Sequence, residues 1–365
     1  MEKLIYQIAL TQIKGIGSIT AKTLLAHVGD IEDIFKQTRA QLLKIPQIGE
    51  YLVGQLTKER DEAFRRAERE MEFIVKKKIT PLFFTDEKYP YRLKECDDAP
   101  IIVFTRGNQD FNAGRFVSIV GTRKLTDYGR GLCQQLVADL AQKNITIVSG
   151  LAYGADICAH KAALDAGLNT VGVLGHGLDR IYPALHRSTA VKMLSQGALL
   201  TEYLSETNPD APNFLQRNRI VAGLADAVVV IESAKKGGSL STATLANDYN
   251  RDVFAFAGRV GDEFSAGCNT LIKENKAALI ESAEDLEKMM GWEISPKGKN
   301  AIEPALFTDL SEEEKKVLLL TKDGMHINQI ALKMELPISR IAPMLIEMEF
   351  KGVIKPLPGS MYRAI

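Results

Sequence analysis

The stretch Val117–Gly129, VSIVGTRKLTDYG, begins as an apolar run, stops at Gly121 and then places a cation, Arg123, in the segment beyond. An apolar run that ends at a glycine is typical of a strand buried on both faces of a parallel sheet. Further runs of this kind follow along the chain, and amphipathic segments of helical length lie between them. They are ITIVSG (145–150), TVGVLG (170–175), ALLTEYL (198–204), DAVVVIE (226–232), DVFAFAG (252–258) and AALIES (277–282). This alternation predicts an α/β fold with a doubly wound, mostly parallel sheet.

Smaller domains are expected on both sides of this extended Rossmann-like region. The N-terminal segment contains short helical patterns joined by glycine turns, KGIG (14–17) and IPQIG (45–49). These turns resemble paired helix-hairpin-helix (SAM-like) units, although a small bundle that uses its glycines only to turn fits the pattern too. The charged segment 58–78 is expected to be a solvated surface helix that leads out of this domain.

The C-terminal segment has three helical patterns and a terminal hairpin, which is winged-helix spacing. It follows a stretch with two prolines and no periodicity, which is typical of a linker. The predicted organisation is a helical domain at 1–78, the Rossmann-like domain at 79–291, a linker at 292–308 and a winged-helix domain at 309–365.

The composition gives the protein no net positive charge that would attract nucleic acid or another anionic partner. Lysine plus arginine and aspartate plus glutamate both number 46, so the formal net charge is zero and any phosphate binding must be local. The four cysteines form no CxxC pair and the five histidines never pair at ligand spacing, which indicates a reducing compartment and no metal site. No apolar run approaches the roughly 20 residues of a membrane span, and the N-terminus lacks a leader pattern. We therefore expect a cytoplasmic protein with no membrane partner.

Glycines and cations gather after the predicted strands. Ligands of an open parallel sheet bind beyond the carboxyl ends of its strands. Glycines let backbone amides approach a ligand, helix N-termini favour anions, and arginine binds phosphate bidentately. The loops therefore predict a phosphate-binding edge, with the alternative that Arg217 and Arg219 pair with carboxylates of the sheet.

The common nucleotide and hydrolase signatures are absent. The sequence contains no G-x-G-x-x-G after the first strand, no G-x-x-x-x-G-K-[ST] and no G-x-S-x-G. His160 lies in an alanine-rich helical pattern and is interpreted as a packed residue. We therefore expect phosphate recognition without a cofactor and without catalytic residues.

Taken in order, several motifs resemble one family. They are VGTR (120–123), SGLA-x-GAD (149–156), a YP step at 182–183, TEY (201–203), NF-x-x-RNR (213–219), GGSL (237–240) and FA-x-x-G (254–258). The set is similar to the DNA-processing protein A (DprA/Smf) family. The resemblance implies a single-stranded DNA-binding recombination mediator and not an enzyme. Such proteins protect incoming strands in natural transformation, help to load the RecA recombinase, and form homodimers through the Rossmann-like domain.

The resemblance also implies which positions contact DNA. Two positions depart from the family pattern: Tyr153 and His186 stand where arginine and asparagine are frequent. Tyr153 offers a face for base stacking, or alternatively packs on the sheet edge. The implied DNA-binding residues are Gly121, Thr122, Arg123, Lys124, Gly150, Tyr153, Gly154, Arg187, Lys192, Phe214, Arg217, Asn218, Arg219, Gly238, Ser239 and Thr242.

Two rival functions remain at this point. The sheet resembles that of nucleoside-monophosphate phosphoribohydrolases, but Thr244 stands where their glutamate would fall, so the general acid or base is missing. A winged-helix regulator of duplex DNA is the other rival. Its recognition helix would contain Glu347 and Glu349, and this low basicity favours a protein-contact or auxiliary DNA role instead.

Overall fold

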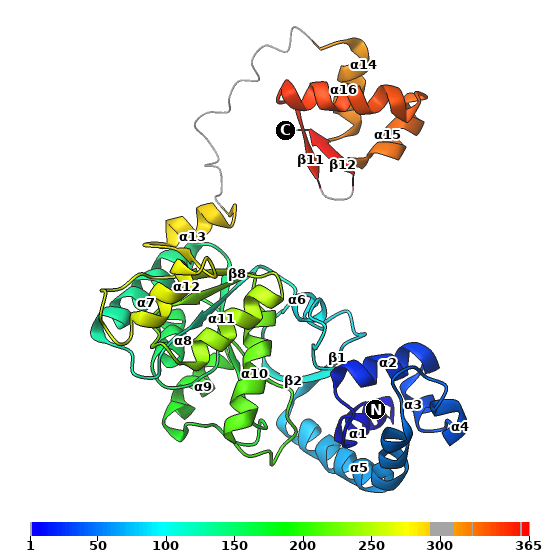
Figure 1. Cartoon of the computed structure of the whole chain (residues 1–365), viewed down its shortest axis with the longest axis vertical. Helices are drawn as coiled ribbons and strands as arrows, with labels where there is room; N and C mark the ends of the chain where they lie inside the picture. The colour runs from blue at the N-terminus through cyan, green and yellow to red at the C-terminus, as the bar shows by residue number, and fades with distance from the viewer. Residues whose placement is uncertain (1, 293–309, 323, 358–359, 365) are drawn as a thin grey trace. The chain divides into compact units, whose positions relative to one another are not determined.

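The computed structural model describes residues 2–292, 310–322, 324–357 and 360–364. The chain divides into two compact units, Met1–Glu293 and Ile294–Ile365, which are described separately (Figure 1). Most of the predicted linker, from 293 onward, lies outside the described residues. None of the helices in the described ranges combines the length and the apolar character that a membrane span requires.

A nine-stranded sheet forms the centre of the first unit, in the order β1-β2-β6-β5-β4-β3-β7-β8-β9. Strands β3 to β9 are parallel to one another, whereas β2 pairs antiparallel with both β1 and β6. This confirms the predicted doubly wound, mostly parallel fold. The strands are β1 (Thr80–Phe83), β2 (Ile102–Gly107), β3 (Arg115–Val120), β4 (Ile145–Ser149), β5 (Thr170–Val173), β6 (Gly197–Thr201), β7 (Ala227–Val230), β8 (Asp252–Ala255) and β9 (Ala278–Leu279).

Both faces of the sheet are buried, which explains the continuous apolar runs. In β3, Phe116 and Val120 belong to one core cluster, while Val117 and Ile119 belong to another. Alternate residues of a strand point to opposite faces, so a strand covered on both sides is apolar throughout. The first cluster includes residues of α10 (Ala211–Gly223) and α11 (Gly238–Asp248), and the second includes residues of α7 (Asp127–Asp139), α8 (Ala155–Asp165) and α13 (Ala283–Met289).

The order of the strands places a topological switch at β3. The chain moves from β3 through β4 and β5 to β6 on one side, then returns to β7 on the other side of β3. The loops that follow β3 and β7 lead to helices on opposite faces of the sheet, and in doubly wound folds this point of the carboxyl edge is where ligands bind. Three further helices complete this part: α6 (Tyr91–Lys94), α9 (Arg187–Met193) and α12 (Ala266–Lys273).

The N-terminal helices share a core with the edge of the sheet, and in Figure 1 they gather beside β1 and β2. They are α1 (Glu2–Gln12), α2 (Ser18–Val28), α3 (Ile31–Ile34), α4 (Arg39–Leu42) and α5 (Glu50–Lys77). The predicted helix in the charged segment 58–78 is present, but the expectation that it is a solvated helix leading out of the domain was wrong, because one of its faces is buried. That segment continues the 28-residue helix α5, and its Ala63, Ala67, Glu70 and Ile74 are buried. Their helical spacing was hidden among the charged residues of the other faces.

The second unit has the predicted winged-helix pattern. Its core includes Val317, Ile330, Ile341 and Leu345, one or more from each helix. The short strands form a sheet in the order β10-β12-β11. The elements are α14 (Glu312–Leu320), β10 (Met325–His326), α15 (Ile327–Met334), α16 (Ile338–Phe350), β11 (Ile354–Leu357) and β12 (Met361–Ala364).

Candidate nucleic-acid interface

The loop after β3 exposes Arg123 from a firmly held backbone. The Thr122 N–H donates to the Glu232 carbonyl (2.7 Å), and the Ala155 N–H donates to the Thr122 carbonyl (3.1 Å). The loop after β4 presses against this segment, since a Cβ built on Gly154 would lie 2.1 Å from the Thr122 oxygen. Arg123 and Lys124 are exposed, and their side chains make no ion pair or hydrogen bond to any residue that the structure describes. Both cations are therefore available to a ligand.

A buried carboxylate, Glu232, lies between the loops after β3 and β7 at the switch point. It accepts hydrogen bonds from the Thr126 N–H (2.9 Å) and the Thr126 hydroxyl (2.5 Å), and thus supports the N-terminus of α7. In dinucleotide-binding folds this helix terminus binds a pyrophosphate. The internal negative charge disfavours such a group here. Sequence reasoning missed this role, although the glutamate that ends DAVVVIE was its signal.

Arg217 lies beneath the loop that follows β4, with 4% of its surface exposed. Its Nη1 donates to the Val173 carbonyl (2.9 Å), and its Nε has no hydrogen-bond partner within the described chain. Burial lowers the pKa of this guanidinium, and the nearby positive charge of Arg123 lowers it further, while the negative charge of Asp156 opposes both. Arg217 and Arg123 therefore lie near the same edge of the sheet, where the carboxylate of Asp156 offsets part of the positive charge of Arg217.

Arg219 has a different environment, although it is only two positions further along α10. Its Nη2 forms an ion pair with the Glu202 carboxylate, and its Nη1 donates to the Asp98 carbonyl (2.5 Å). Burial raises the pKa of Glu202, and the charge of Arg219 counteracts that rise. Arg219 therefore pairs with a carboxylate at the sheet, as the alternative interpretation of the sequence proposed. Arg217 forms no ion pair with any of the described residues.

Aromatic rings lie on the same edge. Tyr182, after β5, is 48% exposed, and its ring centroid lies 5.7 Å from that of Phe214 on α10. Tyr153 is 46% exposed and packs edge-on against His186, with centroids 5.0 Å apart. Tyr153 thus both packs on the edge and keeps an open face. Tyr182 was not among the predicted DNA-binding residues, although its place in the YP step at 182–183 could have suggested an aromatic ring at this edge.

The remaining predicted residues divide into exposed and structural groups. Arg187 and Lys192 are exposed on α9, but Lys192 lies more than one helical turn further from the carboxyl edge. Asn218 Nδ2 donates weakly to the Gly238 carbonyl (3.5 Å), and the Thr242 hydroxyl donates to the same oxygen (3.1 Å).

The loop after β7 is held from within. The buried Ser239 hydroxyl donates to the Ser233 hydroxyl (2.9 Å), and Gly238 is exposed at the N-terminus of α11.

In the loop after β3, Gly121 is packed tightly, because a Cβ there would lie 2.7 Å from that of Ala155. Gly121 and Ser239 therefore set the conformation of the loops at this edge and present little surface of their own to a ligand.

The family model of the DNA recombination-mediator protein A matches residues 80–291, which is more than half of the chain. The chain belongs to the DprA/Smf family. Models of a SAM-like helix-hairpin-helix tandem and of a DprA winged helix domain match residues 8–62 and 303–360. The family resemblance of the sequence motifs is thereby confirmed.

Individual DprA/Smf proteins agree with this assignment. Protein Smf of Synechocystis sp. is 30% identical, and the alignment covers 98% of each chain. The crystal structure of DprA from Streptococcus pneumoniae has a TM-score of 0.64 at 29% identity, covering 79% of this chain and 97% of that one. DprA from Helicobacter pylori, whose structure was reported for its single-stranded DNA binding mode, has a TM-score of 0.54 at 29% identity. That match covers 59% of this chain and 96% of the Helicobacter chain.

Proposed function

We propose that this chain is a single-stranded DNA-binding recombination mediator, and that the strand lies along the carboxyl edge of the sheet. The observation that carries the proposal is the exposed Arg123, whose side chain has no partner among the described residues. Its backbone is fixed by Glu232 and Gly154, and the buried Arg217 lies close by. Family membership and the DNA-binding mode reported for the Helicobacter relative support it.

The chemistry of the edge suits a single strand. Arg123, Lys124 and Arg187 would contact phosphates, and Phe214 with Tyr182 would offer ring faces to unpaired bases. Each stacked base contributes about 1–3 kcal/mol in proteins of this kind, without sequence preference. A neutral protein can bind in this way because the cations are local, and its affinity falls as salt rises.

We further propose that the protein protects incoming strands in natural transformation, assists loading of a RecA-type recombinase and acts as a homodimer through the Rossmann-like domain. Family membership supports these roles. The winged-helix domain would make protein or auxiliary DNA contacts, since its α16 contains Glu347 and Glu349. No catalytic step is proposed. The hydroxyl of Thr244, at the position of a hydrolase glutamate, donates to the Leu240 carbonyl of its own helix (3.0 Å).

Fluorescence anisotropy of labelled oligo-dT, compared with a matched duplex at two salt concentrations, tests the binding function. We expect tight, salt-sensitive preference for the single strand. Equal binding to duplex, or no binding, would contradict it. Recombinase loading is tested by RecA-dependent ATP hydrolysis on oligo-dT coated with single-stranded DNA-binding protein, and light scattering at micromolar concentration tests the dimer.

A further inference from the structure

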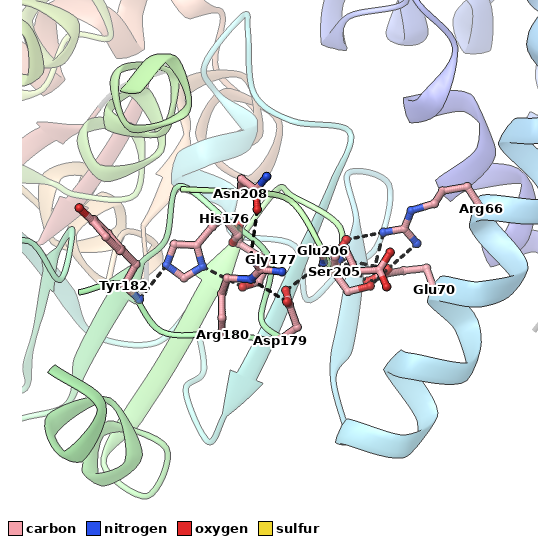
Figure 2. A network of polar contacts seen from close by, with 11 residues as sticks. Arg66, Glu70, His176, Gly177, Asp179, Arg180, Tyr182, Ser205, Glu206 and Asn208 are labelled. Carbon is pink, nitrogen blue, oxygen red and sulfur yellow. Dashed lines mark hydrogen bonds and ion pairs between the residues drawn. The ribbon is translucent and has the colours of Figure 1, made fainter. Parts of the chain in front are cut away.

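The N-terminal domain inserts a buried carboxylate into the loop between β6 and α10. Glu70 of α5 is 2% exposed and accepts hydrogen bonds from the Ser205 N–H (3.0 Å) and hydroxyl (2.6 Å). Arg66, one turn earlier, pairs with Glu70 (2.9 Å) and donates to the Ser205 carbonyl (2.5 Å) (Figure 2). A buried carboxylate is stable only when its oxygens are satisfied, so this contact fixes the loop firmly against α5.

The fixed loop is tied to the segment that follows β5. The Glu206 N–H donates to Asp179 Oδ1 (3.0 Å). Arg180 donates from Nε to Asp179 Oδ2 (2.8 Å) and from Nη1 to Asn208 Oδ1 (3.0 Å). The two backbones also touch, since a Cβ on Gly177 would lie 2.4 Å from the Leu204 oxygen. Movement of one loop therefore moves the other.

The same segment carries Tyr182. The buried His176 donates from Nδ1 to the Gly177 carbonyl (2.8 Å), which leaves Nε2 to accept from the Tyr182 N–H (3.3 Å). Burial lowers the pKa of His176, in agreement with the neutral ring that this pair of hydrogen bonds requires. Figure 2 shows the contacts running from Arg66 and Glu70 on one side to Tyr182 on the other.

We propose that Glu70 is a positioning residue for single-stranded DNA binding: through Ser205, Glu206 and Asp179 it holds the segment that presents the ring of Tyr182 beside Phe214. This inference rests on the proposed function. The N-terminal domain then contributes to DNA binding by fixing the position of the Tyr182 segment, whether or not the domain itself touches DNA.

Three variants of the full chain test the inference by anisotropy with labelled oligo-dT: Glu70→Ala, Asp179→Ala and Tyr182→Ala. We expect each to weaken binding by about tenfold, which is the loss of roughly one stacked base. The matched control is Glu62→Ala, which removes from the same helix an exposed carboxylate whose ion pairs within the described chain are with Arg65 and Arg69. This control should bind as the wild type does.

A double-mutant cycle separates positioning from general destabilisation. If Glu70 acts through Tyr182, Glu70→Ala combined with Tyr182→Ala binds no more weakly than Tyr182→Ala alone. Additive losses, or wild-type affinity in both Glu70→Ala and Asp179→Ala, would overturn the inference while leaving the proposed function intact. Should Glu70→Ala fail to fold, the same cycle with Asp179→Ala decides. Absence of oligo-dT binding by the wild type would instead overturn the proposed function, and the inference with it.

Discussion

The guanidinium of Arg217 occupies the space that any side chain at residue 150 would need, because a Cβ built on Gly150 would lie 1.6 Å from Nη1. The loop after β4 is thus closed over a cation that comes from α10, a helix more than sixty residues later in the chain. Asp156 holds the loop from below, accepting from the Gly150 N–H (3.1 Å) and the Ala152 N–H (3.3 Å). Residue 150 is therefore a glycine because the guanidinium of Arg217 needs the space that a side chain would fill.

Gly150→Ala should destabilise the protein by about 1–3 kcal/mol, because the methyl group must displace a buried guanidinium. Urea denaturation followed by circular dichroism measures the loss. The matched control is Gly131→Ala in α7, where a Cβ meets nothing within 4 Å and the helix gains up to about 1 kcal/mol. Equal stability of the two variants would contradict this account of Gly150.

Arg123→Ala should weaken binding to oligo-dT by about tenfold and reduce the salt slope of the binding constant by about 0.7, as the loss of one phosphate contact implies. The free energy of unfolding should not change, since Arg123 supports no other residue in the described structure. Arg65→Ala, which removes an exposed arginine from α5, is the control for net charge. An unaltered slope with intact folding would remove Arg123 from the site.

Arg219→Ala should lower the free energy of unfolding by about 3–5 kcal/mol, because it leaves the buried Glu202 carboxylate without its partner. The salt slope of DNA binding should stay at its wild-type value, since the side chain points into the protein. Arg39→Ala breaks an exposed pair with Glu50 and should cost less than about 1 kcal/mol. If Arg219→Ala keeps wild-type stability and loses salt sensitivity, Arg219 contacts phosphate.

His160 should make stability depend on pH. Burial, with smaller contributions from Arg217 and His186, lowers the pKa of His160 to about 3 in the folded protein. The unfolded chain takes up this proton near pH 6.5 and the folded protein does not. Stability is therefore lost as pH falls from about 6.5 towards about 3, by about 1.4 kcal/mol for each pH unit.

Denaturation of wild type and His160→Asn between pH 4.5 and 7.5 tests this effect, and the difference between the curves isolates the contribution of His160. His27→Asn, at an exposed position, is the control. Parallel curves for the wild type and His160→Asn would show that the buried imidazole is not responsible.

The sequence pattern predicts the parallel strands well and the antiparallel ones poorly, for a physical reason. A run such as Val117–Val120 is apolar because both faces are covered, and this property is local. Strand β1 has only four residues and includes Pro81, and it becomes part of the sheet through β2, whose other partner β6 lies about a hundred residues later. The local pattern of apolar and polar residues does not reveal which distant strands pair with each other.

The same distinction separates what could be predicted of the site. Arg123 is placed by the strand that precedes it, so its position follows from local sequence. Arg217 and Arg219 look alike in the sequence, but their surroundings come from Gly150 and Glu202 on other elements. The link between Glu70 and Ser205 spans 135 positions and could be found only in three dimensions.

The carboxylate of Glu232 at the start of α7 has a consequence for how the protein responds to its surroundings. A nucleotide-dependent fold is more stable when its ligand is abundant, because ligand binding favours the native state by mass action. Here the stabilising anion is part of the chain and is always present at one equivalent. The stability of this helix terminus is thus independent of nucleotide supply, and the loop that carries Arg123 keeps this internal support whether or not a ligand is bound.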